Sequence, residues 1–228
     1  MTILTGLLLI ALPISFNVFF AALAVRFDYP QVLRKPTGEV LAAFRDGGSP
    51  LVALWWGFSM TALLFAPVVA LLSGWLQGAD ATLLTVTTAV GVLAAAVQAL
   101  GLVRWPFMVP HLAREMEHAS DAAAEAIDVV FQSLNRYLGV GVGEHLGYLL
   151  TGAWTVLASA AAMQAELLPT WLTIGGVVIG AVLAACSLEF VGPFERDGWK
   201  LAGATVPIAY IAWSLWLAAV GLMVLIAR

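Results

Sequence analysis

Hydrophobic side chains fill six long blocks of this chain, and short polar segments separate the blocks. Each block holds about 20 residues, the length at which an α-helix crosses a hydrocarbon core about 30 Å thick. The pattern predicts an all-α, polytopic membrane protein that forms a single domain over residues 1–228. The six expected transmembrane helices cover residues 3–25, 51–73, 81–103, 140–163, 171–191 and 201–227.

The longest interval between blocks, residues 107–138, has a helical pattern of its own. Ser120 is a good N-cap, and Asp121 favours the first turn through the helix dipole. We therefore expect an amphipathic helix before the fourth span, lying on the membrane or packed on the bundle. Glycines at 139, 141 and 143 offer a hinge, so its continuity with the fourth span stays open. Its apolar face would hold Ile127, Val130, Phe131, Leu134 and Leu138.

Two other connections carry structural signals. Residues 27–50 are expected to form a loop with a short helix at residues 39–44. The sequence Arg104-Trp105-Pro106 is expected to end the third span, because an interfacial Arg and a proline both favour a helix end.

Small residues recur every four positions along the fourth span, and a second stripe of small residues runs along the fifth. Such stripes let two helix backbones approach closely inside lipid. Because a short turn joins these spans, we predict that they form a closely packed antiparallel pair. The stripes are Gly139, Gly143, Gly147, Thr151, Thr155 and Ser159 in the fourth span, and Gly176, Gly180 and Ala184 in the fifth.

Composition narrows the class of protein. Hydrophobic residues make up 62% of the chain and charged residues 11%, which is too apolar for an ordinary soluble domain. The net charge of −4 comes without a basic patch, so no nucleic-acid partner is expected. A single cysteine, Cys186, excludes an intramolecular disulfide and a CxxC motif. The first block lacks the basic region and cleavage site of a signal peptide, so we expect a retained helix.

Basic residues predict the orientation in the membrane, because cytoplasmic loops are enriched in Lys and Arg. The connections after the first, third and fifth spans hold nine basic residues, and the other side holds only Arg228. We therefore expect these connections and the amphipathic helix in the cytoplasm, with both termini outside. The nine are Arg26, Arg34, Lys35, Arg45, Arg104, Arg114, Arg136, Arg196 and Lys200.

Polar side chains from three spans are expected at one depth. By the helical rise, Glu144, Glu189 and Gln98 each lie roughly 26–28 Å from the outer end of their spans. That level is just inside the cytoplasmic edge of the hydrocarbon core. An ionisable residue at membrane depth is costly, and it is therefore a functional candidate. The candidate binding layer comprises Glu144, His145, Glu189, Gln98, Arg104, Arg26, Tyr148 and Tyr210.

Two interpretations of this layer remain open. Two close carboxylates do not both ionise readily, so one would hold a proton or Arg104 would neutralise them. A shared proton would suit a proton-coupled transporter or a relay. Alternatively, the carboxylates pair with arginines or reach the interface, and their role is to fix helix packing and orientation.

Metal and catalytic chemistry have less support. His111 and His118 lie seven residues apart, and with Glu115 and Glu117 they could form a weak metal site. A solvated, charged loop explains the same residues. His145 has no second axial partner at its depth for a haem. No candidate nucleophile has a histidine at its own level, so neither a catalytic residue nor a cofactor is expected.

Three sequence segments carry a family resemblance. They are FQSLNRY at 131–137, GEHLGYLLTGAWT at 143–155 and LLPTWLTIGGVVIGAVLAACSLEFVG at 167–192. Across about residues 127–193 the chain resembles a family of bacterial six-helix membrane proteins, domain-of-unknown-function family 4386. The first half resembles it in hydropathy and span order. The resemblance implies a six-span inner-membrane protein and carries over no catalytic residue.

These features favour a bacterial inner-membrane helical bundle without a catalytic centre, acting as an accessory, sensory or hydrophobic-ligand-binding component. The tryptophans at mid-span, Trp154, Trp213 and Trp216, could line an apolar pocket or be packed between helices. The alternative is a small proton-coupled transporter with a cytoplasm-facing site around Glu144, Glu189 and Arg104. A membrane-embedded enzyme or cofactor protein comes third. The expected partners are membrane lipid and a further membrane protein.

Cysteine substitutions at Gly78 and Asp197 test the orientation. The bias of basic residues puts the second connection outside and the fifth inside. A membrane-impermeant maleimide should therefore label Gly78→Cys in intact cells, and Asp197→Cys only after the cells are opened. Labelling of Asp197→Cys in intact cells, with Gly78→Cys protected, would contradict the topology.

Overall fold

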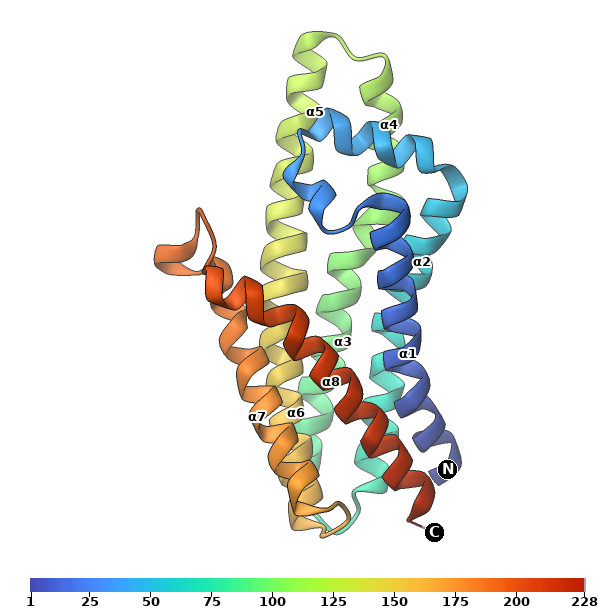
Figure 1. Ribbon diagram of the computed structural model, residues 1–228, viewed down its shortest axis with the longest axis vertical. Coiled ribbons are helices and arrows are strands. Elements are labelled where there is room, and N and C mark those ends of the chain that lie inside the picture. Colours follow the sequence, from blue (N-terminus) through green and yellow to red (C-terminus); the bar gives the residue numbers. More distant parts are fainter. Residues whose placement is uncertain (228) are drawn as a thin grey trace.

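The computed structural model describes residues 1–227 as a bundle of long helices (Figure 1). It confirms the predicted fold class. Six helical segments are long and apolar enough to cross a membrane, and residues 1–227 contain no strand. α1 begins and α8 ends at the same end of the bundle. The spanning helices are α1 (Thr2–Phe27), α2 (Thr37–Trp75), α3 (Ala81–Phe107), α6 (Gly147–Gln164), α7 (Thr170–Cys186) and α8 (Lys200–Ile226). The shorter helices are α4 (Val109–Glu117), α5 (Asp121–Leu134) and the π-helical segment η2 (Asn135–Leu146). The 3-10 turns are η1 (Gln31–Arg34), η3 (Ser187–Phe190) and η4 (Gly192–Phe194).

A helical cap lies at the end of the bundle away from the first residue (Figure 1). It consists of α4, α5 and the first part of α2, residues 37–47. α4 and α5 form a hairpin that projects beyond the bundle, and the first part of α2 crosses beside them. The expectation of a loop before residue 120 was therefore wrong, because residues 109–117 are helical.

The third span does not end at Arg104-Trp105-Pro106, contrary to the prediction. α3 continues to Phe107, and α4 begins at Val109 after a single residue. Two features allow helical structure to continue past Pro106 and Pro110. Trp105 is fully buried in the core, and Pro110 lies in the first turn of α4, where a missing N–H costs no hydrogen bond.

The expected loop at residues 27–50 is also mostly helical. α2 starts at Thr37 and breaks at Gly48, whose φ of 56° and ψ of −157° suit glycine and few other residues. The short helix expected at residues 39–44 is therefore real but longer. Buried side chains at helical spacing hold it in place: Val40, Leu41 and Phe44.

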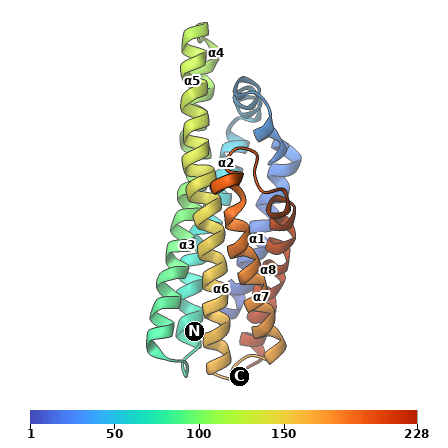
Figure 2. The same ribbon diagram turned by 90° about the vertical axis from the view of Figure 1, so that its left-hand side faces the viewer.

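The amphipathic helix and the fourth span form one continuous rod (Figure 2). Ser120 caps α5 as predicted and accepts a hydrogen bond from the Ala123 amide. α5 then passes through η2 into α6 without a break. η2 covers 12 residues, whereas π-helices usually occur as single turns and often mark functional sites. The glycines thus coincide with a change of helix type and not with an interruption. On the expected apolar face Phe131 is buried, but Val130 is 44% exposed.

Two hydrophobic cores stabilise the molecule. The core beneath the cap is aromatic, and Trp55 and Trp105 stack in its centre with ring centroids 4.4 Å apart. The second core fills the bundle toward the chain termini. There Phe65 packs edge-on against Trp154 and Trp213, with centroids 4.8 and 5.5 Å away. The mid-span tryptophans are therefore packed between helices.

α6 and α7 form the close pair that the small residues predict. The contact is centred on Gly152 and Gly180. A β-carbon at Gly180 would lie 2.6 Å from the carbonyl oxygen of Gly152 and 2.9 Å from the Val156 side chain. Gly152 lies outside the predicted stripe, but the last residue of that stripe, Ser159, faces Gly176 of α7 as predicted.

The first part of the predicted stripe faces α3. A β-carbon at Gly147 would lie 3.1 Å from the Gln98 side chain, and one at Gly143 would lie 3.2 Å from Cα of Gly101. The physical reason is the winding of η2. A spacing of four residues follows a different face on a π-helix than on an α-helix, because the π-helix has the wider turn.

Alanine substitutions test the α6–α7 contact. Gly180→Ala should lower the free energy of unfolding by about 1–3 kcal/mol, because its methyl group meets backbone atoms of α6. Gly175→Ala is the matched control on the same helix. Its β-carbon would meet open space, so it should be neutral or stabilise by up to about 1 kcal/mol. Unfolding in mixed micelles measures both, and equal stabilities would contradict the contact.

Candidate functional site

A polar cavity of about 180 Å³ opens where η2 meets η3 and the α7–α8 connection. It contains four of the side chains that the sequence assigned to the candidate layer. The cavity is lined by Arg136, Val140, Gly141, Glu144, His145, Tyr148, Ser187, Glu189, Phe190, Val191 and Glu195.

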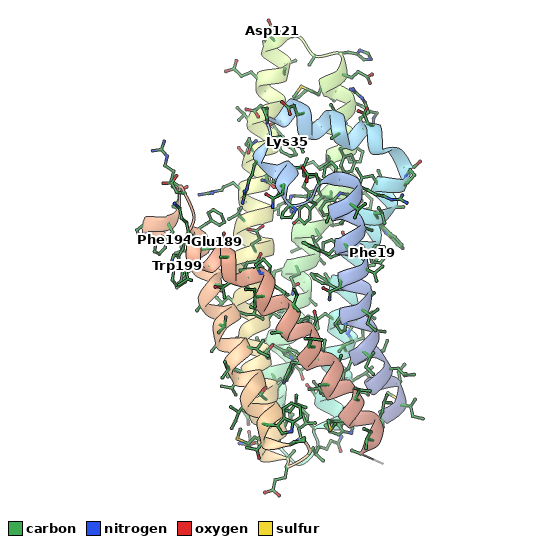
Figure 3. All side chains as sticks on the ribbon, viewed as in Figure 1. Phe19, Lys35, Asp121, Glu189, Phe194 and Trp199 are labelled. Carbon is green, nitrogen blue, oxygen red and sulfur yellow. The ribbon has the colours of Figure 1, made fainter. Side chains whose placement is uncertain are left out.

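Glu144 and Glu189 reach the cavity from different elements. Glu144 lies near the end of η2. Glu189 lies in η3, because α7 ends at Cys186, before the end of the predicted fifth span. A β-carbon at Gly203 would lie 2.7 Å from Glu189 Oε1, so this carboxylate rests on the first turn of α8. Figure 3 shows Glu189 beside Phe194 and Trp199 at this corner. Within residues 1–227 neither Glu144 nor Glu189 forms an ion pair.

His145 ties the two walls of the cavity together. Its Nδ1 lies 2.7 Å from the carbonyl oxygen of Ser187. A carbonyl oxygen only accepts hydrogen bonds, so Nδ1 carries a proton and donates it. This leaves Nε2 as the ring nitrogen available to a ligand. His145 therefore joins η2 to η3 and also offers a polar atom to the cavity.

Arg136 fastens the α7–α8 connection over the cavity. Its guanidinium forms an ion pair with Glu195, hydrogen-bonds the Glu195 carbonyl oxygen, and lies 5.4 Å from the ring centroid of Phe190. The Arg136 and Glu195 side chains are 43% and 69% exposed. Such exposed pairs contribute at most about 1 kcal/mol, so the connection can open at small cost.

Arg104 does not pair with a carboxylate, contrary to the expectation. Arg104 as a whole residue is 9% exposed. Its guanidinium donates to the carbonyl oxygen of Gly101 and to Asn135 Oδ1 at 2.9 Å, and it lies over the Trp105 ring. Glu144 is close enough to act on it electrostatically. Neutral oxygens and a ring face thus solvate this buried charge.

The remaining candidates lie outside the cavity lining. Gln98 donates to Thr151 Oγ1 at 2.9 Å and joins α3 to α6. Tyr210 lies behind Tyr148, with ring centroids 5.4 Å apart. Arg26 is exposed at the end of α1 and takes no part in the layer.

Tyr29, which follows α1, lies beside the layer and was missed by the sequence reasoning. Burial chiefly, with a smaller contribution from Glu144, raises the pKa of its phenol to about 12, although Arg104 opposes this. The hydroxyl therefore stays protonated at neutral pH.

Three polar residues of the site were also missed: Asn135, Arg136 and Glu195. The sequence pattern used Arg136 only as an orientation signal and did not single out Glu195. The sequence spacing of the cavity-lining residues on η2 could have indicated that they share one face. Arg136, Val140 and Glu144 recur every four residues, which is one face of a wide helix, but a π-helix was not considered.

The weak metal candidates do not converge. His111 Nδ1 lies 3.9 Å from Glu115, four residues along α4. Among residues 1–227 no three His, Cys, Asp or Glu side chains are grouped to hold a metal ion. Both side chains of the His111–Glu115 pair are 61% exposed, so this pair is a solvated one.

The fold and the polar layer together define a six-helix polytopic membrane protein with a capped end. Comparison with protein families gives its membership. The chain belongs to the family described as Domain of unknown function (DUF4386), whose profile matches residues 4–221. The match covers the first half of the chain as well as the second, where the resemblance in sequence was noted. Comparisons with curated proteins and with solved structures gave no match.

Removing the amide of Asn135 tests how Arg104 is solvated. Asn135→Ala should lower the free energy of unfolding by about 1.5–3 kcal/mol, because it leaves a buried guanidinium N–H unpaired. Ser133→Ala is the control, since that side chain is exposed on the preceding turn. If both variants unfold at the same denaturant concentration, the Arg104–Asn135 hydrogen bond contributes nothing to the free energy of unfolding.

Proposed function

We propose that this protein is a binding component of the bacterial inner membrane that takes a small cationic solute into a cytoplasm-facing polar cavity. One observation carries the proposal. Two carboxylates from different elements, Glu144 and Glu189, line one cavity and have no ion-pair partner within residues 1–227. Carboxylates in such a site are costly unless a cation, a proton or water compensates them.

The charges around the cavity favour a cation over an anion. Arg136 forms its ion pair with Glu195, so neither Glu144 nor Glu189 has a cationic side chain as a direct ion-pair partner within residues 1–227. The Tyr148 and His145 side chains add further hydrogen-bonding groups to the lining. An ammonium group carries several N–H donors and would find acceptors on both walls.

The volume of the cavity limits the ligand to a small one. At about 30 Å³ for each water molecule, 180 Å³ corresponds to roughly six waters. Pockets for drug-sized ligands measure about 300–1,000 Å³. Methylammonium and similar short amines fit this volume.

The packing beyond the cavity favours binding over transport. Between the cavity and the far end of the bundle, Trp154, Trp213 and Phe65 are buried and packed edge to face. A site that is reached from one side suits a receptor or an accessory subunit.

A small cation-coupled transporter is the second candidate, because one observation favours it. Hydroxyl groups continue along α6 from the level of the cavity at Thr151, Thr155 and Ser159, and the buried Ser159 hydroxyl has no partner in the described residues. Such a line of hydroxyls could accompany an ion through a core that opens transiently.

Ligand-dependent stability tests the binding proposal. Methylammonium chloride should raise the unfolding temperature of the protein in lipid nanodiscs above that in sodium chloride of the same ionic strength. Glu144→Gln and Glu189→Gln should each weaken this binding at least about tenfold, because each removes a charge-assisted hydrogen bond. Glu166→Gln, an exposed acid on the α6–α7 turn, is the matched control and should bind normally. Equal stabilisation by the two salts would contradict the proposal.

Flux separates the two candidates. Proteoliposomes should bind radiolabelled methylammonium without accumulating it if the protein is a binding component. Uptake driven by a pH gradient, and lost in both Gln variants, would instead establish the transporter.

A further inference from the structure

Four connections join the cap to the bundle: the segment between α1 and α2, and three departures from regular α-helix. α2 breaks at Gly48, α3 passes into α4 at Met108, and α5 passes into α6 through η2. The chain leaves or enters the cap at each break, because the cap comprises residues 37–47, α4 and α5.

Polar contacts hold the cap together as a unit. Thr37 donates to Asp128 and accepts from Gln132 Nε2 at 2.9 Å, which joins the start of α2 to α5. Arg45 lies 3.8 Å from Glu117, which joins the same segment to α4. These contacts link the start of α2 to both α4 and α5.

All three parts of the cap reach the aromatic core around Trp55 and Trp105, through Phe44 of α2, Val109 of α4 and Phe131 of α5. Four residues after Phe131, the chain of α5 continues directly into η2. The aromatic core is therefore a pivot, and η2 sets the direction in which α5 leaves the bundle.

η2 is built so that a change at the cavity reaches α5. One face of η2 lines the cavity with Arg136, Glu144 and His145. The opposite face lies against α3 at Gly143 and Gly101, where the two backbones meet with no side chain between them. This contact itself contains no interlocking side chain, whereas Arg104 of α3 bonds Asn135 at the start of η2. A 12-residue π segment also has an α-helical alternative within reach, which is more tightly wound and longer along its axis.

We infer that η2 transmits occupancy of the cavity to the cap. A bound cation draws Glu144 on η2 toward Glu189 on η3, and η2 turns against Gly101. α5 is the direct continuation of η2, so the cap tilts about the aromatic core. The projecting α4–α5 hairpin is then the output surface of a membrane sensor. This inference rests on the proposed binding function, and it adds the response that binding produces.

Distances between spin labels test the inference in the full-length protein, in a Cys186→Ser background. One label pair, at Ala122 in the cap and Leu201 at the start of α8, reports on the cap. A second pair, at Thr82 and Thr170 near the far end of the bundle, is the control; all four positions are exposed. Saturating methylammonium should shift the mean cap distance by about 2 Å or more, the size of helix shifts in known switches, and leave the control pair unchanged.

A second set of measurements tests the inference with variants instead of methylammonium. The double variant Glu144→Gln with Glu189→Gln neutralises the cavity and should also move the cap pair, whereas Glu166→Gln should not. Gly101→Ala places a methyl group 2.6 Å from Cα of Gly143 and should displace the cap without ligand, against Gly74→Ala, which meets open space.

The outcomes separate the two claims. If methylammonium binds and the cap distance stays fixed, the binding function stands and the transmission is overturned. If methylammonium does not bind but neutralising the cavity moves the cap, the transmission stands and the proposed ligand is wrong. If neither the ligand nor the double variant moves the cap, the inference fails, whatever Gly101→Ala does to stability.

Discussion

The solvation of charged side chains inside an apolar bundle is the constraint on which the rest of this structure depends. A buried charge needs a partner or water, and the molecule uses both solutions at one level. Arg104 is surrounded by a carbonyl oxygen, an amide oxygen and an indole ring. Glu144 and Glu189 instead line a cavity of about 180 Å³. Arg104 thus donates to neutral groups, and within residues 1–227 it forms no ion pair with either acid.

The polar layer also divides the molecule mechanically. An aromatic core lies on the cap side and a larger apolar core on the other, and η2 runs between Phe131 of the first core and Trp154 of the second. A regular α-helix would keep one face directed toward the same neighbour along its whole length. The π winding of η2 allows one helix to pack its small residues on α3 while it turns Glu144 and His145 toward η3. The change of helix type therefore has a direct consequence for the site.

Much of the architecture could be predicted from the sequence, because span length and hydropathy depend on the bilayer alone. The shared depth of Glu144 and Glu189 followed from helical rise, and both line one cavity. The face of the glycine stripe and the partner of Arg104 could not be predicted. Both depend on η2, and a π-helix leaves no mark in hydrophobic periodicity. The continuation of α3 past Pro106 was missed for a similar reason, because tertiary packing around Trp105 overrides the local signal.

The central claim is that Glu144 and Glu189 act together on one cation. A double-mutant cycle on methylammonium affinity, with Glu144→Gln, Glu189→Gln and the double variant, measures this most directly. If both carboxylates contact the same cation, their effects on the binding free energy will differ from additivity by about 0.5–3 kcal/mol. Additive effects within experimental error would show that the two acids act independently, and would contradict the account.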